Sequence, residues 1–233
     1  MLQFTLSPRV GSIKVVLVED DPLVRDTTRR LLACEADIDL LGEAENGQAA
    51  LDLVQRLRPA VLLLDHGLPG MTGLDVLYQL HAAGDAPRVL IYTGHVCAKL
   101  AHLALHSGAD GFLAKIDAPR VLAQAVRTVA RGETYISPCI RDQVMRRSFK
   151  HTASPRHVRL TQQDMQVLRL LADGASIQAI GRHLHISERT VHNRIDTIRA
   201  ILGVESREEA IAWAAACGFS SFGKVPTTEH GNA

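Results

Sequence analysis

Four short apolar runs, each followed by a polar residue of a particular type, constrain the fold of this 233-residue chain more than any other feature. The runs and the residues that end them are Val15–Val18 with Glu19, Val61–Leu64 with Asp65, Val89–Tyr92 with Thr93, and Gly111–Ala114 with Lys115. Continuous apolar runs of this kind are typical of strands buried on both faces of a parallel sheet. Because the carboxyl ends of parallel strands form one edge, we expect these four side chains to gather there.

Helix-like segments alternate with the apolar runs from Ile13 to Arg131. A further strand is expected at Asp39–Ala44, which completes five strand–helix repeats of roughly 25 residues. The expected helices are Pro22–Cys34, Gln48–Leu57, Leu74–His81, Lys99–His106 and Pro119–Arg131. The pattern predicts an α/β domain with a doubly wound, five-stranded parallel sheet.

The chain beyond residue 158 has helical periodicity and no strand pattern. Thr161 begins a capping-box-like sequence with Asp164 at its fourth position. Helices are expected after Thr161, over Ile177–Leu184, over Glu188–Leu202 with Ser187 as N-cap, and over Arg207–Cys217. A short helix, a tight turn and a longer helix form a helix-turn-helix, so the second domain is all-α. The expected organisation is a lead-in (1–12), the α/β domain (13–131), its end with a basic linker (132–158), four helices (159–217) and a flexible tail (218–233).

Composition and charge exclude several classes of protein. The chain is 46% hydrophobic and 22% charged, and none of its apolar stretches approaches the length of a membrane span. The first eleven residues lack the apolar core of a secretory signal. Four dispersed cysteines disfavour a disulfide framework or a zinc ribbon and favour buried free thiols in a reducing cytoplasm. Residues 131–233 carry 14 Lys/Arg against 10 Asp/Glu, which suits a polyanionic partner.

The side chains expected at the sheet edge form an electrostatically balanced set. Glu19, Asp20 and Asp65 offer the oxygen ligands that Mg²⁺ prefers, and such a cation neutralises an approaching phosphoryl group. Thr93 can donate its hydroxyl to a phosphoryl oxygen, and Lys115 adds a compact positive charge. Single acids at strand ends are commonly just solvated, but the joint pattern favours a phosphoryl-accepting site at Asp65.

The helix expected over Glu188–Leu202 has one apolar and one polar face. Val191, Ile195, Ile198 and Leu202 share a stripe, whereas the opposite face carries Arg189, Asn193, Asp196, Thr197 and Ala200, with His192 on its flank. This polar face can enter a major groove, where Asn193 can bond an adenine edge and Arg189 can reach guanine or phosphate. Taken alone, the helix also fits an ordinary solvated amphipathic helix.

The motifs resemble two known modules. Residues 13–131 resemble the receiver domain of two-component response regulators in VLVEDDPLVR (16–25), LLLDHGLPGMTGL (62–74), Thr93 and GADGFLAK (108–115). Residues 160–217 resemble the NarL/FixJ (LuxR-type) helix-turn-helix domain in LTQQDMQVLRLLADGAS (160–176) and ISERTVHNR (186–194). The resemblance implies a flavodoxin-like receiver fold and a transcription regulator controlled by phosphorylation.

The resemblance also implies roles for individual residues. Asp65 becomes the phosphoacceptor for a sensor histidine kinase, and the ligands of Mg²⁺ become Asp20, Asp65, the Gly67 carbonyl and, through water, Glu19. Thr93 and Lys115 become the catalytic and phosphate-sensing pair, with Thr93 and Phe112 as the switch residues. His192, Asn193 and Asp196 fall on base- or phosphate-contacting positions, and the expected DNA-binding set is completed by Arg189, Arg194 and Thr197.

The expected protein is therefore a cytoplasmic regulator with no membrane contact and no enzymatic role beyond Mg²⁺-dependent phosphorylation and dephosphorylation of its own Asp65. Few cations in the helical domain favour binding of double-stranded DNA as a homodimer, with Ala210, Ile211 and Ala214 as a candidate dimer surface. An acid at Asp196 repels phosphate unless it accepts a hydrogen bond from cytosine or orients Arg199 or Arg189.

Two rival interpretations come from other classes of protein. An aspartyl-phosphate phosphatase also uses an aspartate at a strand end, but it needs a second acid two residues later, where this chain has Gly67. A receiver that acts through a protein partner would use its helical domain only for dimerisation.

Overall fold

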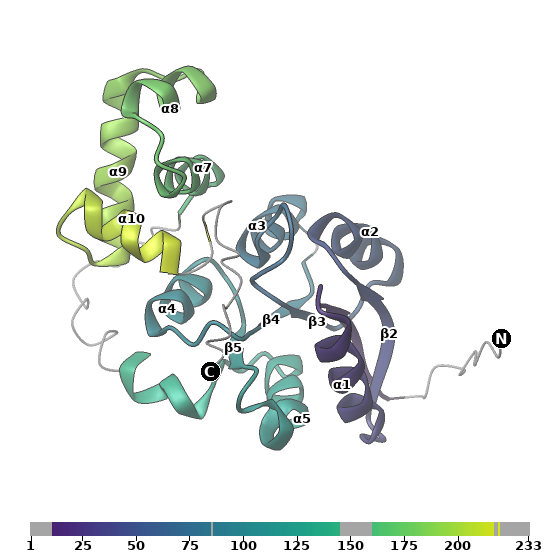
Figure 1. Cartoon of the computed structure of the whole chain (residues 1–233). Coiled ribbons are helices and arrows are strands. Elements are labelled where there is room, and N and C mark those ends of the chain that lie inside the picture. Colours follow the sequence, from purple (N-terminus) through teal and green to yellow (C-terminus); the bar gives the residue numbers. More distant parts are fainter. Residues whose placement is uncertain (1–10, 85, 145–159, 217–218, 220–233) are drawn as a thin grey trace, which may run out of the picture. The chain divides into compact units, whose positions relative to one another are not determined.

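The chain folds into two compact units, residues 1–159 and 160–233, and each is described here by itself. The computed structural model describes residues 11–84, 86–144, 160–216 and 219 (Figure 1). Most of the expected lead-in and tail, and residues 145–158 of the expected linker, lie outside these residues. Within the described part, none of the helices is long and apolar enough to cross a membrane.

The first unit contains a parallel sheet with strand order β2-β1-β3-β4-β5-β6. The strands are β1 (Ile13–Val18), β2 (Ile38–Ala44), β3 (Val61–Leu64), β4 (Arg88–Thr93), β5 (Gly111–Ala114) and β6 (Tyr135–Ile136). The doubly wound parallel sheet is confirmed, but the expected count of five strands is wrong. Since β6 has only two residues and no alternating pattern, the sequence gives no strand signal for it.

Helices cover the sheet on both faces (Figure 1). They are α1 (Pro22–Ala33), α2 (Gly47–Leu57), α3 (Gly73–Ala83), α4 (Ala98–His106) and α5 (Ala118–Ala130). Helices α1 and α5 pack on one face, where their apolar residues join Leu17, Leu63 and Tyr92 in a single core cluster. Successive strand residues point to opposite faces, so Phe112, beside Leu113 of this cluster, faces the other side.

The central strands are completely removed from solvent, as the apolar runs predict. All residues of Val15–Val18, Val61–Leu64 and Phe112–Ala114 are 0% exposed. Each fully buried Leu or Val of this kind stabilises the fold by about 1.5–3 kcal/mol relative to an exposed one. The same burial fixes the strand ends rigidly, and this is what positions the polar residues that follow them.

Short polar side chains cap the starts of the helices by accepting hydrogen bonds from backbone N–H groups. Asp21 caps α1 by accepting from the N–H of Leu23 at 2.8 Å, and Pro22 occupies the first helical turn. Thr72 and Asp75 form a capping box at α3. Asp21 therefore has a structural role of its own, next to the acidic pair Glu19–Asp20.

The second unit is entirely helical in its described part. Its helices are α7 (Gln162–Ala172), α8 (Ile177–Leu184), α9 (Glu188–Leu202) and α10 (Arg207–Ala216). The capping box of Thr161 and Asp164 is present, and Ser187 caps α9. The turn between α8 and α9 is tight because Gly181 has no side chain: a Cβ there would lie 2.9 Å from the carbonyl oxygen of Ile186.

Two expectations from the sequence are wrong in this structure. Cys34 and Cys139 are exposed and Cys97 is partly exposed, because Cys34 and Cys97 lie at helix ends and Cys139 lies in a short 3-10 helix (Pro138–Ile140) after β6; Cys217 lies outside the described residues. Ala210 and Ala214 are 0% exposed, so these two residues are not available as a dimer surface, whereas Ile211 is partly exposed and its place in such a surface stays a prediction. Helix α10 packs against α7 and α9, which accounts for this burial.

Ser137 ties the extra strand to the loop after β5. Its hydroxyl donates to Asp117 Oδ2 at 2.5 Å and accepts the N–H of Ala114 at 3.1 Å, and the residue is 0% exposed. Asp117 accepts a second hydrogen bond from the N–H of Cys139. These bonds, with that of Ser137 first, lower the pKa of Asp117.

Replacing Ser137 by Ala is expected to lower the free energy of unfolding of the first unit by about 1–3 kcal/mol, because the buried N–H of Ala114 and the half-buried carboxylate of Asp117 lose their partner. Urea unfolding followed by circular dichroism measures this loss. The matched control is Thr134→Ala, which is exposed and is expected to change stability by less than about 0.5 kcal/mol. Equal stability of the two variants would contradict the structural role of Ser137.

Candidate functional site

The polar residues that end four of the strands meet at one edge of the sheet, as predicted. Lys115 Nζ lies 2.5 Å from Glu19 Oε2 and 3.1 Å from Asp65 Oδ2. Glu19, Asp65 and Thr93 are buried, and Thr93 Oγ1 accepts the N–H of His95 at 3.1 Å. One ammonium group thus joins the ends of β1, β3 and β5.

Strand register explains why these side chains meet. Val18 is paired with Leu64, so Glu19 and Asp65 leave the sheet side by side. Thr93 is paired with Ala114, and the N–H of Lys115 donates to the Thr93 carbonyl oxygen at 2.9 Å. The edge is therefore assembled by backbone pairing of residues that are far apart in the chain, such as Val18 with Leu64, because parallel strands need a long crossover connection.

The electrostatics of the edge favour a cation among the carboxylates. Burial raises the pKa of Glu19, an effect that Lys115 partly offsets and Asp65 reinforces. Burial alone lowers the pKa of Lys115, but Asp65 and Glu19 outweigh it and the net pKa is raised. Lys115 therefore stays protonated, and Glu19 gains from any additional positive charge.

Glu19, Asp20 and Asp65 fit a small hard cation. One oxygen of each lies within 4.8 Å of the others, and all three ligand atoms are carboxylate oxygens of the kind that Mg²⁺ prefers. Asp65 Oδ1 is buried and accepts no hydrogen bond from the described residues, so it has an open acceptor position. A Cβ on Gly67 would lie 3.7 Å from Asp65 Oδ2, which places the backbone of Gly67 next to the acidic cluster.

Arg25 supports this edge and is not among the predicted site residues. Its guanidinium donates to the carbonyl oxygen of Glu19 at 2.7 Å and to that of Asp20 at 3.4 Å. It also donates to Glu45 Oε1 at 2.9 Å. Arg25 lies within the first receiver-like motif, so the sequence contained the signal, but only the fold shows that it holds the backbone of the acidic pair.

Gly73 allows α3 to start directly beside the acceptor. A Cβ at this position would overlap the carbonyl oxygen of Asp65 and would lie 3.0 Å from the Cα of His66. The N–H of Gly73 donates to the His66 carbonyl oxygen at 3.0 Å. The segment between Asp65 and α3 is therefore a closed loop that holds Asp65 in place.

The switch aromatic predicted at Phe112 is a fully buried ring. It is 0% exposed and lies beside Ile91 in the sheet register. Its carbonyl oxygen accepts the N–H of Ser137 at 2.8 Å. This burial agrees with the inward position expected for Phe112, and its role as a switch stays a prediction.

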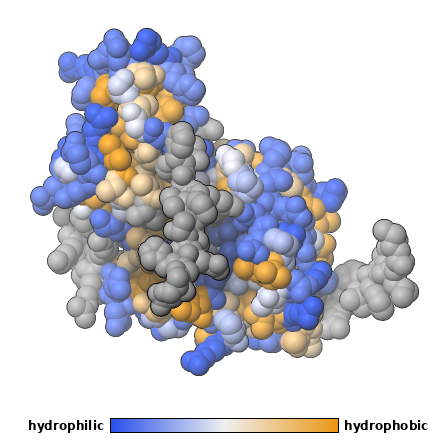
Figure 2. Space-filling model, viewed as in Figure 1, coloured by the Kyte–Doolittle hydropathy of each residue, from blue (hydrophilic) through white to orange (hydrophobic). Residues whose placement is uncertain are grey.

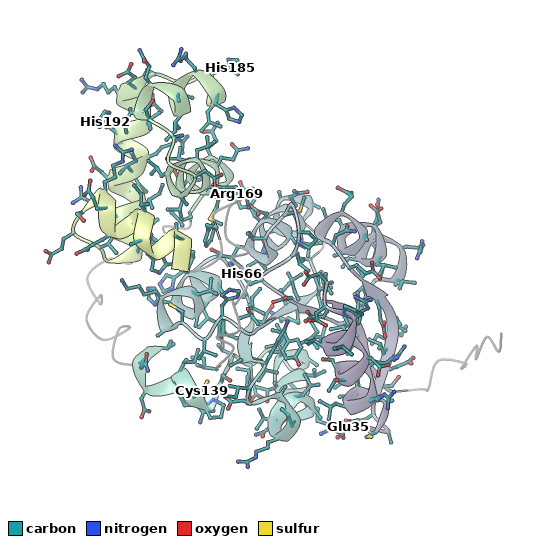
Figure 3. The ribbon with its side chains drawn as sticks, viewed as in Figure 1. Glu35, His66, Cys139, Arg169, His185 and His192 are labelled. Carbon is teal, nitrogen blue, oxygen red and sulfur yellow. The ribbon has the colours of Figure 1, made fainter. Side chains whose placement is uncertain are left out.

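Most of the residues predicted to contact DNA lie on one exposed face of α9. Arg189, His192, Asn193, Asp196 and Thr197 are exposed, whereas Val191, Ile195, Ile198 and Leu202 are buried. The end of this unit that carries α8 is covered mainly by hydrophilic residues (Figure 2). Figure 3 shows His185, at the turn before α9, and His192, on α9, at the outer surface of the unit.

Arg194 differs from the other predicted DNA contacts. Its guanidinium donates to Asp164 Oδ1 at 2.8 Å and to Thr161 Oγ1 at 3.3 Å, and it also bonds Gln163. Asp164 is 3% exposed, so the pair is largely withdrawn from solvent. The capping-box aspartate holds the guanidinium of Arg194, which links α9 to α7, and the predicted role of Arg194 in DNA binding stays a prediction.

Asp196 is paired with a cation of its own helix. Arg199 donates to Asp196 Oδ1 at 3.1 Å and also bonds the carbonyl oxygen of Glu205. This is one of the arrangements that the sequence left open for an acid on this face. The negative charge of Asp196 is partly compensated before any phosphate approaches.

Comparison with known proteins assigns each of the two units to a protein family. Residues 15–127 match the response regulator receiver domain, and residues 158–214 match the luxR family of bacterial regulatory proteins. The chain is 34% identical over 203 residues to the nitrate/nitrite response regulator protein NarP of Escherichia coli K12, covering 87% of this chain and 94% of that protein. This chain belongs to the NarL-type response regulators. It is likewise 31% identical over 206 residues to the probable transcriptional regulatory protein NarL of Mycobacterium tuberculosis H37Rv, covering 88% and 95%.

Solved structures of response regulators share this architecture. The response regulator ChrA of a heme-sensing two-component system has a TM-score of 0.50 at 31% identity, covering 88% of this chain and 97% of that one. RcsB in complex with DNA has a TM-score of 0.59 at 20% identity, covering 88% and 98%, which shows a shared fold. As a NarL-type response regulator, the chain controls transcription by binding DNA, so both rival classes of protein are disfavoured.

Replacing Arg194 by Ala is expected to destabilise the helical unit of this response regulator by about 1–3 kcal/mol, because Asp164 is left buried without its cation. Trp213, the one tryptophan of the chain, is buried in α10, so its fluorescence during urea unfolding reports on this unit alone. The control is Asp196→Ala, whose side chain is exposed and is expected to change the midpoint little. Loss of DNA binding by Arg194→Ala at unchanged stability would contradict this structural role and would identify Arg194 as a contact to DNA.

Proposed function

We propose that Asp65 accepts a phosphoryl group from a sensor histidine kinase, and that the phosphorylated protein regulates transcription as a homodimer on paired DNA half-sites. The observation that carries this proposal is the position of Lys115 Nζ, 3.1 Å from Asp65 Oδ2, at an edge that also holds Thr93 and two further acids. An ammonium and a hydroxyl beside one carboxylate match the charge that a phosphoryl group brings.

The proposed chemistry uses the open oxygen of Asp65. Oδ2 is engaged by Lys115, whereas Oδ1 has no hydrogen-bond donor among the described residues and can attack phosphorus. The P–O bond forms as the P–N bond to the kinase histidine breaks, and the electron pair stays on the imidazole nitrogen. Mg²⁺ bound by Glu19, Asp20, Asp65 and the Gly67 carbonyl would neutralise the charge of the transferred group.

We propose that the new phosphate is sensed by Thr93 and Lys115. Lys115 exchanges the Asp65 carboxylate for a phosphoryl oxygen, and the Thr93 hydroxyl turns from the N–H of His95 toward the phosphate. Thr93 and Phe112 lie in the paired strands β4 and β5, so movement of one strand end repacks the other. This repacking is the step by which a local charge changes a surface used for dimerisation.

An apolar rim around Asp65 supports docking of a protein donor. Of the described residues, the large apolar side chains that are exposed are Leu23 at 78%, Val96 at 46% and Ile116 at 76%. Leu23 follows β1, Val96 follows β4 and Ile116 follows β5, so all three surround the carboxyl edge of the sheet. Exposed apolar residues gathered at one site favour a protein partner there.

For the helical unit, we propose that α9 reads the major groove through Arg189, His192, Asn193 and Thr197. These residues share the exposed face of α9, and α9 follows α8 after a turn of three residues. Asn193 is the best candidate for a base contact, because an amide can bond adenine with two hydrogen bonds. The role of Asp196 is to orient Arg199, with which it pairs at 3.1 Å.

Replacing Asp65 by Asn is expected to abolish phosphorylation by acetyl phosphate and Mg²⁺, because the amide oxygen is a poor nucleophile. Intact mass spectrometry of the full chain measures the added phosphoryl group, and chelation of Mg²⁺ is expected to stop its addition to the unaltered protein. The matched control is Asp21→Asn, since Asn caps α1 equally well and Asp21 lies outside the acidic cluster. Phosphorylation of the Asp65→Asn protein at the normal rate would refute the assignment.

Replacing Asn193 by Ala is expected to reduce the preference for a selected DNA site over random DNA by about tenfold, within the 1–3 kcal/mol of one bidentate base contact. A mobility-shift titration with both DNAs measures this preference, with phosphorylation of Asp65 as a check of the receiver unit. Glu208→Ala on α10 serves as a surface control. An equal loss of affinity for both DNAs would indicate a folding defect instead of lost recognition.

A further inference from the structure

Lys115 has a third neighbour at the sheet edge besides the two carboxylates. Its Nζ lies over the ring of Tyr92, 5.6 Å from the ring centre. A cation within about 6 Å of an aromatic face is attracted by the negative charge of that face. Tyr92 is 3% exposed and the side chain of Lys115 is 20% exposed, so the contact is largely withdrawn from water.

The Tyr92 ring is fixed from its far end by α1. Its hydroxyl oxygen lies 3.1 Å from Thr28 Oγ1, and Thr28 is 1% exposed. Burial, the largest effect, raises the pKa of Tyr92, so the hydroxyl stays neutral and can keep this hydrogen bond. Thr28, Tyr92 and Lys115 line the same pocket of about 260 Å³ between α1 and α5.

The geometry points to Tyr92, held by Thr28, as a positioning residue for Lys115. This inference rests on the proposed phosphorylation of Asp65. During phosphoryl transfer Lys115 must leave the Asp65 carboxylate for a phosphoryl oxygen, while Glu19, at 2.5 Å, competes for the same ammonium. An aromatic face attracts the ammonium without neutralising it, so the ring keeps Lys115 at the edge through the exchange.

The plain alternative is that Tyr92 is an ordinary ring of the core cluster shared by α1 and α5. The two interpretations differ in what they expect of Phe and Leu at position 92. A ring is sufficient to attract Lys115, so Tyr92→Phe should rescue the function that Tyr92→Leu loses. If Tyr92 only fills the core, its replacement lowers stability and has no other effect. Leu90→Ala is the control for such a loss of stability, because Leu90 belongs to the same strand and the same cluster.

The first measurement is the rate at which acetyl phosphate and Mg²⁺ phosphorylate Asp65 in the full chain. Tyr92→Leu is expected to be about tenfold slower than the unaltered protein, within the range of a partly desolvated cation–π interaction. Tyr92→Phe is expected to stay within about threefold, and Leu90→Ala to match the unaltered protein wherever it remains folded. Equal rates for Tyr92→Leu and Tyr92→Phe would overturn the inference.

The second measurement needs no phosphorylation. Proton NMR of Lys115 in the resting chain should show ε-methylene resonances shifted upfield by the ring of Tyr92, and this shift should persist in Tyr92→Phe and vanish in Tyr92→Leu. Thr28→Val should reduce the shift only as far as Tyr92→Phe does, because each change removes the hydrogen bond between the two hydroxyls, and Thr28→Ser should leave the shift as in the unaltered protein. A shift that is the same with and without the ring would overturn the inference. If the unaltered protein gains no phosphate at Asp65, the proposed function fails, and this NMR shift still decides whether Tyr92 holds Lys115.

Discussion

The receiver unit depends on the ion pairs that the ammonium group of Lys115 forms with two carboxylates. This lysine lies against Glu19 from β1 and Asp65 from β3 while its own backbone continues β5. Without this ammonium, the carboxylates at the ends of β1 and β3 would repel each other and would be buried without a cation. The cost of burying these groups is offset only when positive charge sits among them, and this makes the edge responsive to any change in charge at Asp65.

Surrounding residues hold this charge arrangement in place. Arg25 anchors the carbonyl oxygens of Glu19 and Asp20, and Asp117 links the loop after Lys115 to Ser137 and thus to β6. The loop that follows Lys115 is therefore bonded to the last strand of the described receiver.

The helical unit is also held together by an ion pair with a buried carboxylate, Arg194 with Asp164. Asp164 closes the N-terminus of α7 and at the same time accepts Arg194 from α9. One carboxylate therefore fixes both the start of one helix and the orientation of the next. This contact holds α9, and with it the exposed face of that helix, against α7.

The sequence by itself determined the elements, the parallel sheet, the acidic edge and the helix-turn-helix, because apolar periodicity, cap residues and strand-end positions are local signals. The helices α8 and α9 match the predicted ranges, and the residues expected at the edge meet there. Only the tertiary structure decided the partners of individual side chains. Arg194 faces inward because Asp164 lies within reach, Tyr92 meets Lys115 because β4 and β5 are adjacent, and β6 exists because Tyr135 pairs with Gly111. Such contacts join residues far apart in the chain, and no local pattern encodes them.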